Sequence, residues 1–175
     1  MEKEKRFSEP GTPKPDPKYR IDIMADGPYL VHGNPPLQQE ILVLNEEKIP
    51  WEYAKGHAYP THEEPTALCR CGHSKKHPYC DGSHAHTDWD PTLTAENIPL
   101  LEKAELYDGP TVQLADNIEY CAQARICIAK GTIWQLTEDS DNPEAHDLAV
   151  HESMYCPSGR LKLWDKEEET FYEPP

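Results

Sequence analysis

The chain has 175 residues, of which 37% are hydrophobic, and its formal net charge is −15. Such an acidic chain lacks the basic face that nucleic acid phosphates or an anionic membrane surface require, and no apolar stretch approaches the ~20 residues that span a bilayer. Because its mean hydropathy is −0.83, little apolar surface is available for burial, and we expect bound metal to supply part of the folding free energy.

The first residues are charged and rich in proline, so residues 1–18 are expected to form a disordered arm. This arm lacks the apolar core of a secretory signal, which predicts a cytoplasmic protein. The six cysteines would then stay reduced rather than form disulfides.

Alternating apolar residues and turn signals predict a strand-rich α+β fold with two domains, 19–98 and 99–175. Strands are predicted at 19–24, 28–32, 41–44, 105–107, 111–114, 132–136 and 161–164. A helical turn is expected at 99–104, and a helix over 142–155, where Asn142 is the N-cap and Pro143 occupies the first turn. The segment 45–66 has no clear period, although Trp51, Tyr53 and Tyr59 are expected to pack against other residues.

Three cysteines and a histidine fall within sixteen residues, as Cys69, Cys71, Cys80 and His84. Asp81-Gly82 predicts a helix start, which would place Cys80 and His84 on one helical face. Three thiolates and one imidazole suit either tetrahedral zinc or an iron–sulfur cluster. Zinc sites usually use a longer spacing than Cys-x-Cys, so this pair favours one iron of a two-iron cluster, with zinc as the alternative.

The loop that carries these residues is basic, because Arg70, Lys75 and Lys76 outnumber Asp81 and give residues 69–86 a net charge of +2. A buried core position for the cysteines is therefore not expected. The basic rim could orient an electron-transfer partner, or it could simply be solvated. Asp81 is expected to cap backbone amides rather than bind metal.

The run Cys69-x-Cys71-x₂-Ser74-x₃-Pro78-x-Cys80-Asp81-Gly82-Ser83-His84 resembles the signature of the CDGSH iron–sulfur family, the mitoNEET-type proteins. Residues 26–31 also resemble the strand that precedes the cluster loop in that family. The resemblance implies a [2Fe–2S] cluster with Cys69 and Cys71 on the inner iron and Cys80 and His84 on the outer iron. A neutral imidazole in place of a thiolate would raise the reduction potential and make the cluster labile in acid.

The remaining cysteines are Cys121, Cys127 and Cys156, the last of which is followed by Pro157. A Cys-Pro pair after a helix, together with a distant cysteine loop, resembles the single-cluster ferredoxins. The loop reads C-x₂-A-x₂-C, with Ala124 where another cysteine would stand, and the resemblance implies a [3Fe–4S] cluster. The alternatives are a [4Fe–4S] cluster with His151 or solvent as the fourth ligand, and three unrelated cysteines.

The order of the two motifs resembles a group of microbial proteins that carry a further CDGSH motif downstream. This chain has no second such motif, so it is either a shorter member or a piece of a longer protein, and a homodimer is expected. The predicted function is one-electron transfer or redox sensing with a redox partner protein, and no enzymatic activity is expected. The alternatives are a module that stores clusters or passes them to an apo-acceptor protein, and a zinc-bound interaction module.

Overall fold

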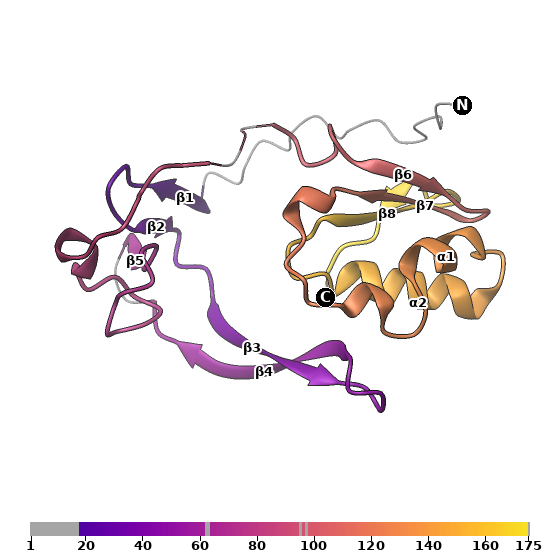
Figure 1. Ribbon diagram of the computed structural model, residues 1–175, viewed down its shortest axis with the longest axis horizontal. Coiled ribbons are helices and arrows are strands. Elements are labelled where there is room, and N and C mark those ends of the chain that lie inside the picture. Colours follow the sequence, from indigo (N-terminus) through magenta and orange to yellow (C-terminus); the bar gives the residue numbers. More distant parts are fainter. Residues whose placement is uncertain (1–17, 62–63, 95, 97, 175) are drawn as a thin grey trace. The chain divides into compact units, whose positions relative to one another are not determined.

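The computed structural model describes residues 18–61, 64–94, 96 and 98–174 (Figure 1). The arm predicted for 1–18 lies, except for its last residue, outside the described residues. The chain divides into two compact units, one formed by 18–39 and 55–97 and the other by 40–54 and 98–174. The described residues form nine strands and two α-helices, which confirms the predicted strand-rich α+β fold.

The unit formed by 18–39 and 55–97 contains an antiparallel sheet in the order β1-β2-β5. Its strands are β1 (Arg20–Ile23), β2 (Tyr29–His32) and β5 (Thr66–Leu68). The first two confirm the strands predicted at 19–24 and 28–32. They are joined by a turn in which Gly27 donates its N–H to the Met24 carbonyl.

A long hairpin connects β2 to β5, formed by β3 (Leu37–Leu44) and β4 (Pro50–Tyr59). The strand predicted at 41–44 is the end of β3, whereas β4 lies where no period was visible. The aromatic residues of this region pack as expected: Trp51 stacks on His151 with ring centroids 3.8 Å apart, and Tyr53 stacks on Tyr155 at 6.1 Å. The turn between the strands is closed by Asn45, whose side-chain oxygen accepts hydrogen bonds from Glu47 and Ile49.

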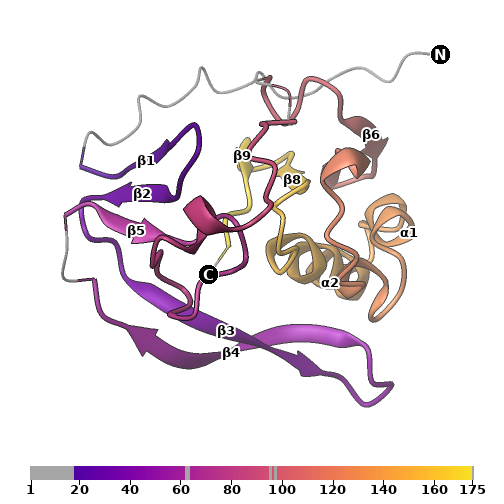
Figure 2. The same cartoon turned by 60° about the vertical axis from the view of Figure 1, so that its left-hand side comes forward.

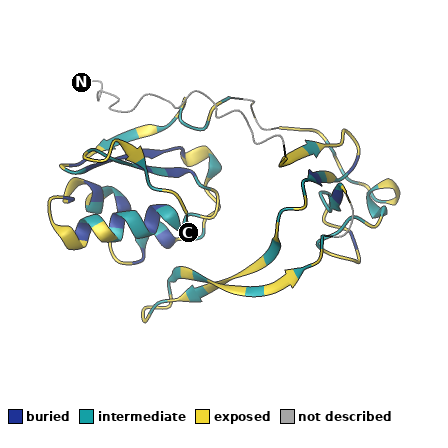
Figure 3. Ribbon diagram, turned by 180° about the vertical axis from the view of Figure 1, so that it is seen from behind, coloured by how far each residue is buried: buried dark blue, intermediate teal, exposed yellow. Residues whose placement is uncertain are grey.

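The unit formed by 40–54 and 98–174 is built on a four-stranded antiparallel sheet in the order β6-β7-β8-β9. Its strands are β6 (Glu105–Asp108), β7 (Val112–Asp116), β8 (Leu161–Asp165) and β9 (Thr170–Phe171). Helices α1 (Ile133–Glu138) and α2 (Pro143–Met154) lie together on one face of this sheet (Figures 1 and 2). The core lies between sheet and helices, where both contribute buried residues (Figure 3): Val112, Leu114, Ile133, Ala149, Leu161 and Leu163.

The strand predicted at 132–136 is wrong, because this segment forms α1. The Thr132 side chain caps the helix by accepting a hydrogen bond from the Gln135 N–H. Ile133 and Thr137, one helical turn apart, are both buried. A short apolar run cannot distinguish strand from helix by period alone, so the cap and the buried helical face decide here.

Helix α2 confirms the prediction over 142–155, with Asn142 accepting a hydrogen bond from Glu144 as N-cap. The turn expected at 99–104 is present as hydrogen bonds from Glu102 to Pro99 and from Ala104 to Leu101. Three short 3₁₀ helices border the cysteine segments: η1 (Ser83–His86), η2 (Ile118–Tyr120) and η3 (Ile126–Ile128). No helix in the described ranges is long and apolar enough to cross a membrane.

Candidate iron–sulfur sites

The first cysteine loop starts at the end of β5 and is closed at its base by backbone hydrogen bonds. Cys69 donates its N–H to the Pro78 carbonyl at 2.8 Å, and Cys80 donates to the Ala67 carbonyl at 2.9 Å. Between them, Leu68 and Tyr79 form an isolated antiparallel bridge. The loop is thus held at both ends, with Cys69 and Cys80 on neighbouring antiparallel segments, one on each side of that bridge.

The four predicted donors form two close pairs. The sulfurs of Cys69 and Cys71 are 3.8 Å apart, and the Cys80 sulfur is 3.4 Å from Nδ1 of His84. Two thiolates bound at ~2.3 Å to one tetrahedral metal would be about 3.8 Å apart, and a thiolate and an imidazole nitrogen about 3.5 Å apart. Each pair is therefore spaced to hold one metal atom. Among the described residues, no three or more such donors surround one metal position.

The predicted helical face for Cys80 and His84 is wrong, although the two residues do meet. The helix η1 starts only at Ser83, because Gly82 adopts a left-handed conformation with φ +85°. Cys80 therefore lies before the helix, and the turn at Gly82 rather than a helical repeat brings the two side chains together.

Asp81 caps backbone amides, as the sequence predicts. Its carboxylate oxygens accept hydrogen bonds from the Ser83 N–H at 3.0 Å and the Lys75 N–H at 2.9 Å. Hydrogen bonds from Ser83 and Lys75 hold the pKa of this carboxyl well below its usual range. In its carboxylate form, Asp81 thus fixes the loop on both sides of Cys80.

The interior of the loop is held by Ser74, which is buried. Its hydroxyl donates to the Tyr79 carbonyl at 2.7 Å and accepts from the Lys76 N–H at 3.0 Å. Burial acts to raise the pKa of the Cys69 thiol, but hydrogen bonds from the backbone of Ser74 and Gly72 outweigh this and leave the pKa lowered. Backbone N–H groups in this loop therefore favour a thiolate, the form that binds metal.

Arg70 is not part of a free basic rim, because its guanidinium is used inside this unit. It donates to four backbone carbonyl groups, at 2.9–3.0 Å, which belong to Met24, Ala25, Gly27 and Pro91. It also lies over the Trp89 ring, 4.7 Å from its centroid. Since Arg70 stands between Cys69 and Cys71, these contacts tie the cysteine pair to the β1–β2 turn. Of the predicted rim, Lys75 and Lys76 stay exposed.

The same turn also lies beside His84. A Cβ atom at Gly27 would lie 3.9 Å from Nε2 of His84, the ring nitrogen that does not face Cys80. The Trp89 ring contacts the imidazole edge-on, with ring centroids 6.3 Å apart. The imidazole is therefore enclosed by residues from the turn and from the segment that follows η1.

The second set of cysteines comes from three segments of the other unit and lines one small recess. Cys121 follows η2 and is exposed, Cys127 lies in η3, and Cys156 follows α2. Ala124 lines the same recess, as do Arg125, Pro157 and Arg160. The structure therefore brings together the three cysteines that the sequence grouped, with the alanine among them. Thiolates are the usual ligands of iron–sulfur clusters, so this donor set fits one.

Charged groups surround Cys127 in particular. Burial, together with the negative charges of Glu152, Cys156 and Cys121, raises the pKa of the Cys127 thiol to about 11. Glu152 itself is fully buried on α2, and its Oε1 accepts hydrogen bonds from the N–H groups of Ala129 and Lys130. Its Oε2 has no hydrogen-bond partner. Burial raises the pKa of this carboxyl to about 7, against the opposite effect of the two hydrogen bonds.

His151, an alternative fourth ligand from the sequence, is engaged elsewhere. Its Nε2 contacts the Trp51 carbonyl oxygen at 2.9 Å, and its ring stacks between Trp51 and Tyr155. It does not line the recess. The structure therefore gives no support to His151 as a cluster ligand.

Sequence reasoning missed the role of the buried polar residues behind this recess. Asp116, on β7, pairs with Arg160 and accepts a hydrogen bond from Trp134 Nε1 at 3.1 Å. These partners come from distant parts of the chain, and no local sequence pattern predicts the contacts between them. Glu152 had one available signal, because it falls on the stripe of α2 that also buries Ala145 and Ala149.

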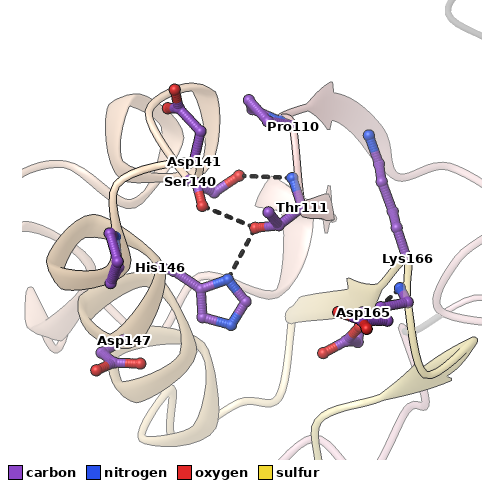
Figure 4. A pocket seen from close by; sticks show the side chains of 10 residues that line it. Pro110, Thr111, Ser140, Asp141, His146, Asp147, Asp165 and Lys166 are labelled. Carbon is purple, nitrogen blue, oxygen red and sulfur yellow. Dashed lines mark hydrogen bonds between the residues drawn. The ribbon is translucent and has the colours of Figure 1, made fainter.

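A larger hollow, of about 540 Å³, lies elsewhere in this unit and contains none of the predicted ligands (Figure 4). Its wall is a hydrogen-bond network in which Thr111 Oγ1 donates to the Ser140 carbonyl and lies 2.8 Å from Nδ1 of His146. His146 Nε2 in turn lies 3.1 Å from the Tyr172 hydroxyl, which donates to Asp165. These bonds join the residue before β7, helix α2, the residue after β9 and the end of β8, and they serve the packing of the unit.

Comparison with known protein families assigns both cysteine segments. Residues 26–85 match the family described as iron-binding zinc finger, CDGSH type, and residues 107–166 match the family described as divergent 4Fe-4S mono-cluster. Searches of curated proteins and of solved structures gave no significant match.

Proposed function

Since the chain joins a CDGSH iron-binding segment to a divergent mono-cluster segment, as its sequence predicts, it is an iron–sulfur protein, and we propose that it transfers single electrons or senses redox state. The proposed centres are a [2Fe–2S] cluster in the first loop and a second cluster in the recess. An iron–sulfur cluster supplies a site that accepts and releases one electron at a time. In this role the protein is a cytoplasmic electron carrier without enzymatic activity.

The observation that carries the first centre is the arrangement of its donors in two pairs. Cys69 with Cys71, and Cys80 with His84, are each spaced for one tetrahedral metal atom. Two metal atoms with two protein donors each are what a [2Fe–2S] cluster requires, whereas a single zinc ion would need all four donors around one position. The pairing therefore supports the two-iron cluster over the zinc-bound interaction module.

The chain's own residues prepare this site for an anionic cluster. Backbone N–H groups lower the pKa of Cys69, and Arg70 fixes the segment between the first two cysteines. His84 contributes a neutral ligand, which leaves the site with one less negative charge than four thiolates and favours reduction. A proton taken up by His84 would compete with the metal, so the site should open in acid.

For the second centre, the three cysteines and Ala124 in one recess support a [3Fe–4S] cluster. The description of the matching family favours a [4Fe–4S] cluster as the alternative, with solvent as the fourth ligand. No further cysteine is available, because the chain has six and the first site uses three.

Spectroscopy of the purified protein tests both centres. Iron and sulfide analysis should find more than the two irons of one [2Fe–2S] cluster, and the oxidised protein should give the EPR signal of a [3Fe–4S] centre near g ~2.01. If the second centre gives an EPR signal only after reduction, and iron analysis finds one more iron per chain, the second centre is a [4Fe–4S] cluster instead of a [3Fe–4S] cluster. A colourless protein that contains zinc would refute the proposal as a whole.

A second candidate function is the storage and transfer of clusters to an apo-acceptor protein. It is favoured by the partial exposure of the first site, where Cys69, Cys71 and Cys80 are all accessible to some degree. The two functions differ in rate: a carrier should exchange electrons many times within the lifetime of its cluster, whereas a donor should lose the cluster to an acceptor first. Mixing the loaded protein with an apo-ferredoxin, and following both processes, separates them.

For electron transfer and for cluster transfer alike, the partner is another protein. We also propose that the chain forms a homodimer. One face of β1 carries Ile21 and Ile23, which are 63% and 48% exposed. Apolar side chains on an edge strand are costly to leave in water, and contact with a second copy would cover them. Light scattering on the parent and on Ile21→Glu measures whether a dimer exists and whether this face forms it.

A further inference from the structure

Arg160 is buried at the second site, in the turn before β8. Only 3% of the residue is exposed, and it lines the recess together with the three cysteines. Its backbone is fixed too, because the Arg160 carbonyl accepts a hydrogen bond from the Asn117 N–H. Arginine is among the residues least often buried in proteins, so the burial of Arg160 requires an explanation.

The guanidinium has two partners, one on each side. Nη1 forms an ion pair with Asp116, which is 6% exposed and is held in turn by Trp134. Nη2 points to the Cys127 sulfur, to which it donates a hydrogen bond at 4.0 Å. The pair with Asp116 therefore orients the guanidinium toward a predicted cluster ligand.

Stability does not explain this arrangement. A buried ion pair loses so much hydration that apolar residues of similar volume often serve stability as well or better. Glu152 on α2 and the thiolate forms of Cys121 and Cys156 add negative charge near Cys127. Among the buried charged side chains of the described residues, Asp116, Glu152 and Arg160, only Arg160 is a cation.

We propose that Arg160 is a positioning residue that compensates charge at the second cluster site, by donating from Nη2 to the Cys127 sulfur. This inference rests on the proposed function. The hydrogen bond draws negative charge from the ligand sulfur, and the site then holds one added electron more readily. The step is the uptake of one electron from a one-electron donor, with no bond formed or broken in the protein.

The test is a redox titration of the loaded protein with dithionite and mediators, followed by EPR of the second centre. Arg160→Gln keeps a polar side chain but removes the charge, and should make reduction about tenfold less favourable, equal to ~59 mV for one electron. Arg160→Lys keeps the charge and should stay within about threefold of the parent. Arg125→Gln is the matched control, because Arg125 lines the same recess without a hydrogen bond to a sulfur, and should shift the potential by less than half as much.

Each outcome decides the inference. A second centre with full iron and an unchanged potential in Arg160→Gln overturns it and leaves the proposed function intact. A parent protein that contains only two irons overturns the inference together with the proposed second cluster, leaves the first centre intact, and is recognised before any variant is made. If Arg160→Gln loses the second cluster, Arg160→Lys decides: recovery of the cluster with a potential near that of the parent supports a role of the charge, and failure to recover it shows that Arg160 serves only packing.

Discussion

Replacement of Arg70 should loosen the first cluster loop more than any exposed cation in that loop can. The Arg70 guanidinium holds four carbonyl groups of the β1–β2 turn and of Pro91, and stacks on Trp89. Each hydrogen bond contributes about 1 kcal/mol net, and the stacking about 0.5–1 kcal/mol at a partly exposed site.

Arg70→Lys keeps a cation, but one ammonium group cannot reach all of these carbonyl groups, and we expect a loss of about 2 kcal/mol. Arg70→Met removes all the polar contacts and should cost about 4 kcal/mol. For a chain of this size, each kcal/mol shifts a thermal midpoint by about 2–4 °C. The expected shifts are therefore about 4–8 °C for Lys and about 8–16 °C for Met.

The assay is the temperature at which the visible absorbance of the first cluster disappears, under anaerobic conditions and at one heating rate. Lys76→Met is the control, because Lys76 belongs to the same loop and is exposed. If both Arg70 variants stay within about 2 °C of the control, the carbonyl contacts do not hold the loop and the reasoning is wrong.

Three further changes test the sites. Replacing His84 with Cys should retain the first cluster, lower its potential and slow its loss in acid, followed as absorbance decay between pH 5 and 7; an unchanged decay would mean that this histidine does not bind iron. Ala124→Cys should supply the missing thiolate and convert the second centre to [4Fe–4S], so that the oxidised EPR signal disappears and iron rises by one per chain; a persistent signal would contradict the three-iron assignment. Glu152 has a folded pKa of about 7, above its usual value, so the neutral form stabilises the fold at low pH, and up to about 3 kcal/mol is lost as the pH rises from ~4.5 to ~7. Glu152→Gln should remove this pH dependence of the free energy of unfolding, measured by urea denaturation. If the free energies of the parent and the variant change with pH in parallel, burial does not raise the pKa of Glu152.

The sequence sufficed where the determining residues are close together. The donors Cys69 to His84 and the cap Asn142-Pro143 act over a few residues, so their spacing predicts both the loop and helix α2. The turn at Gly82 shows the limit of this reasoning: the pairing of Cys80 with His84 was predicted, but through a helix that does not reach Cys80.

Elsewhere the determining contacts join distant segments, and local patterns were misleading or silent. The segment 132–136 reads as a strand, and becomes α1 because its buried face packs on β6 and β7. Strand β4 has no readable period, since its aromatic residues pack on separate partners rather than on a common core: Trp51 on His151, Tyr53 on Tyr155, and Tyr59 on Tyr79. Arg70 and Arg160 look like ordinary surface cations, and only their carbonyl and carboxylate partners reveal that they point inward.

The two cysteine sites differ in how far along the chain their donors lie. The first site draws all four donors from sixteen consecutive residues, and the bridge between Leu68 and Tyr79 closes that segment. The second site needs Cys156, which stands 29 residues beyond Cys127 and takes its place only when α2 has packed on the sheet. Because a short loop closes at a small entropic cost and a long-range contact waits for the surrounding structure, the donors of the first site come together within one short segment, which Arg70 then ties to the β1–β2 turn. Metal capture at the second site depends on the completed fold of its unit.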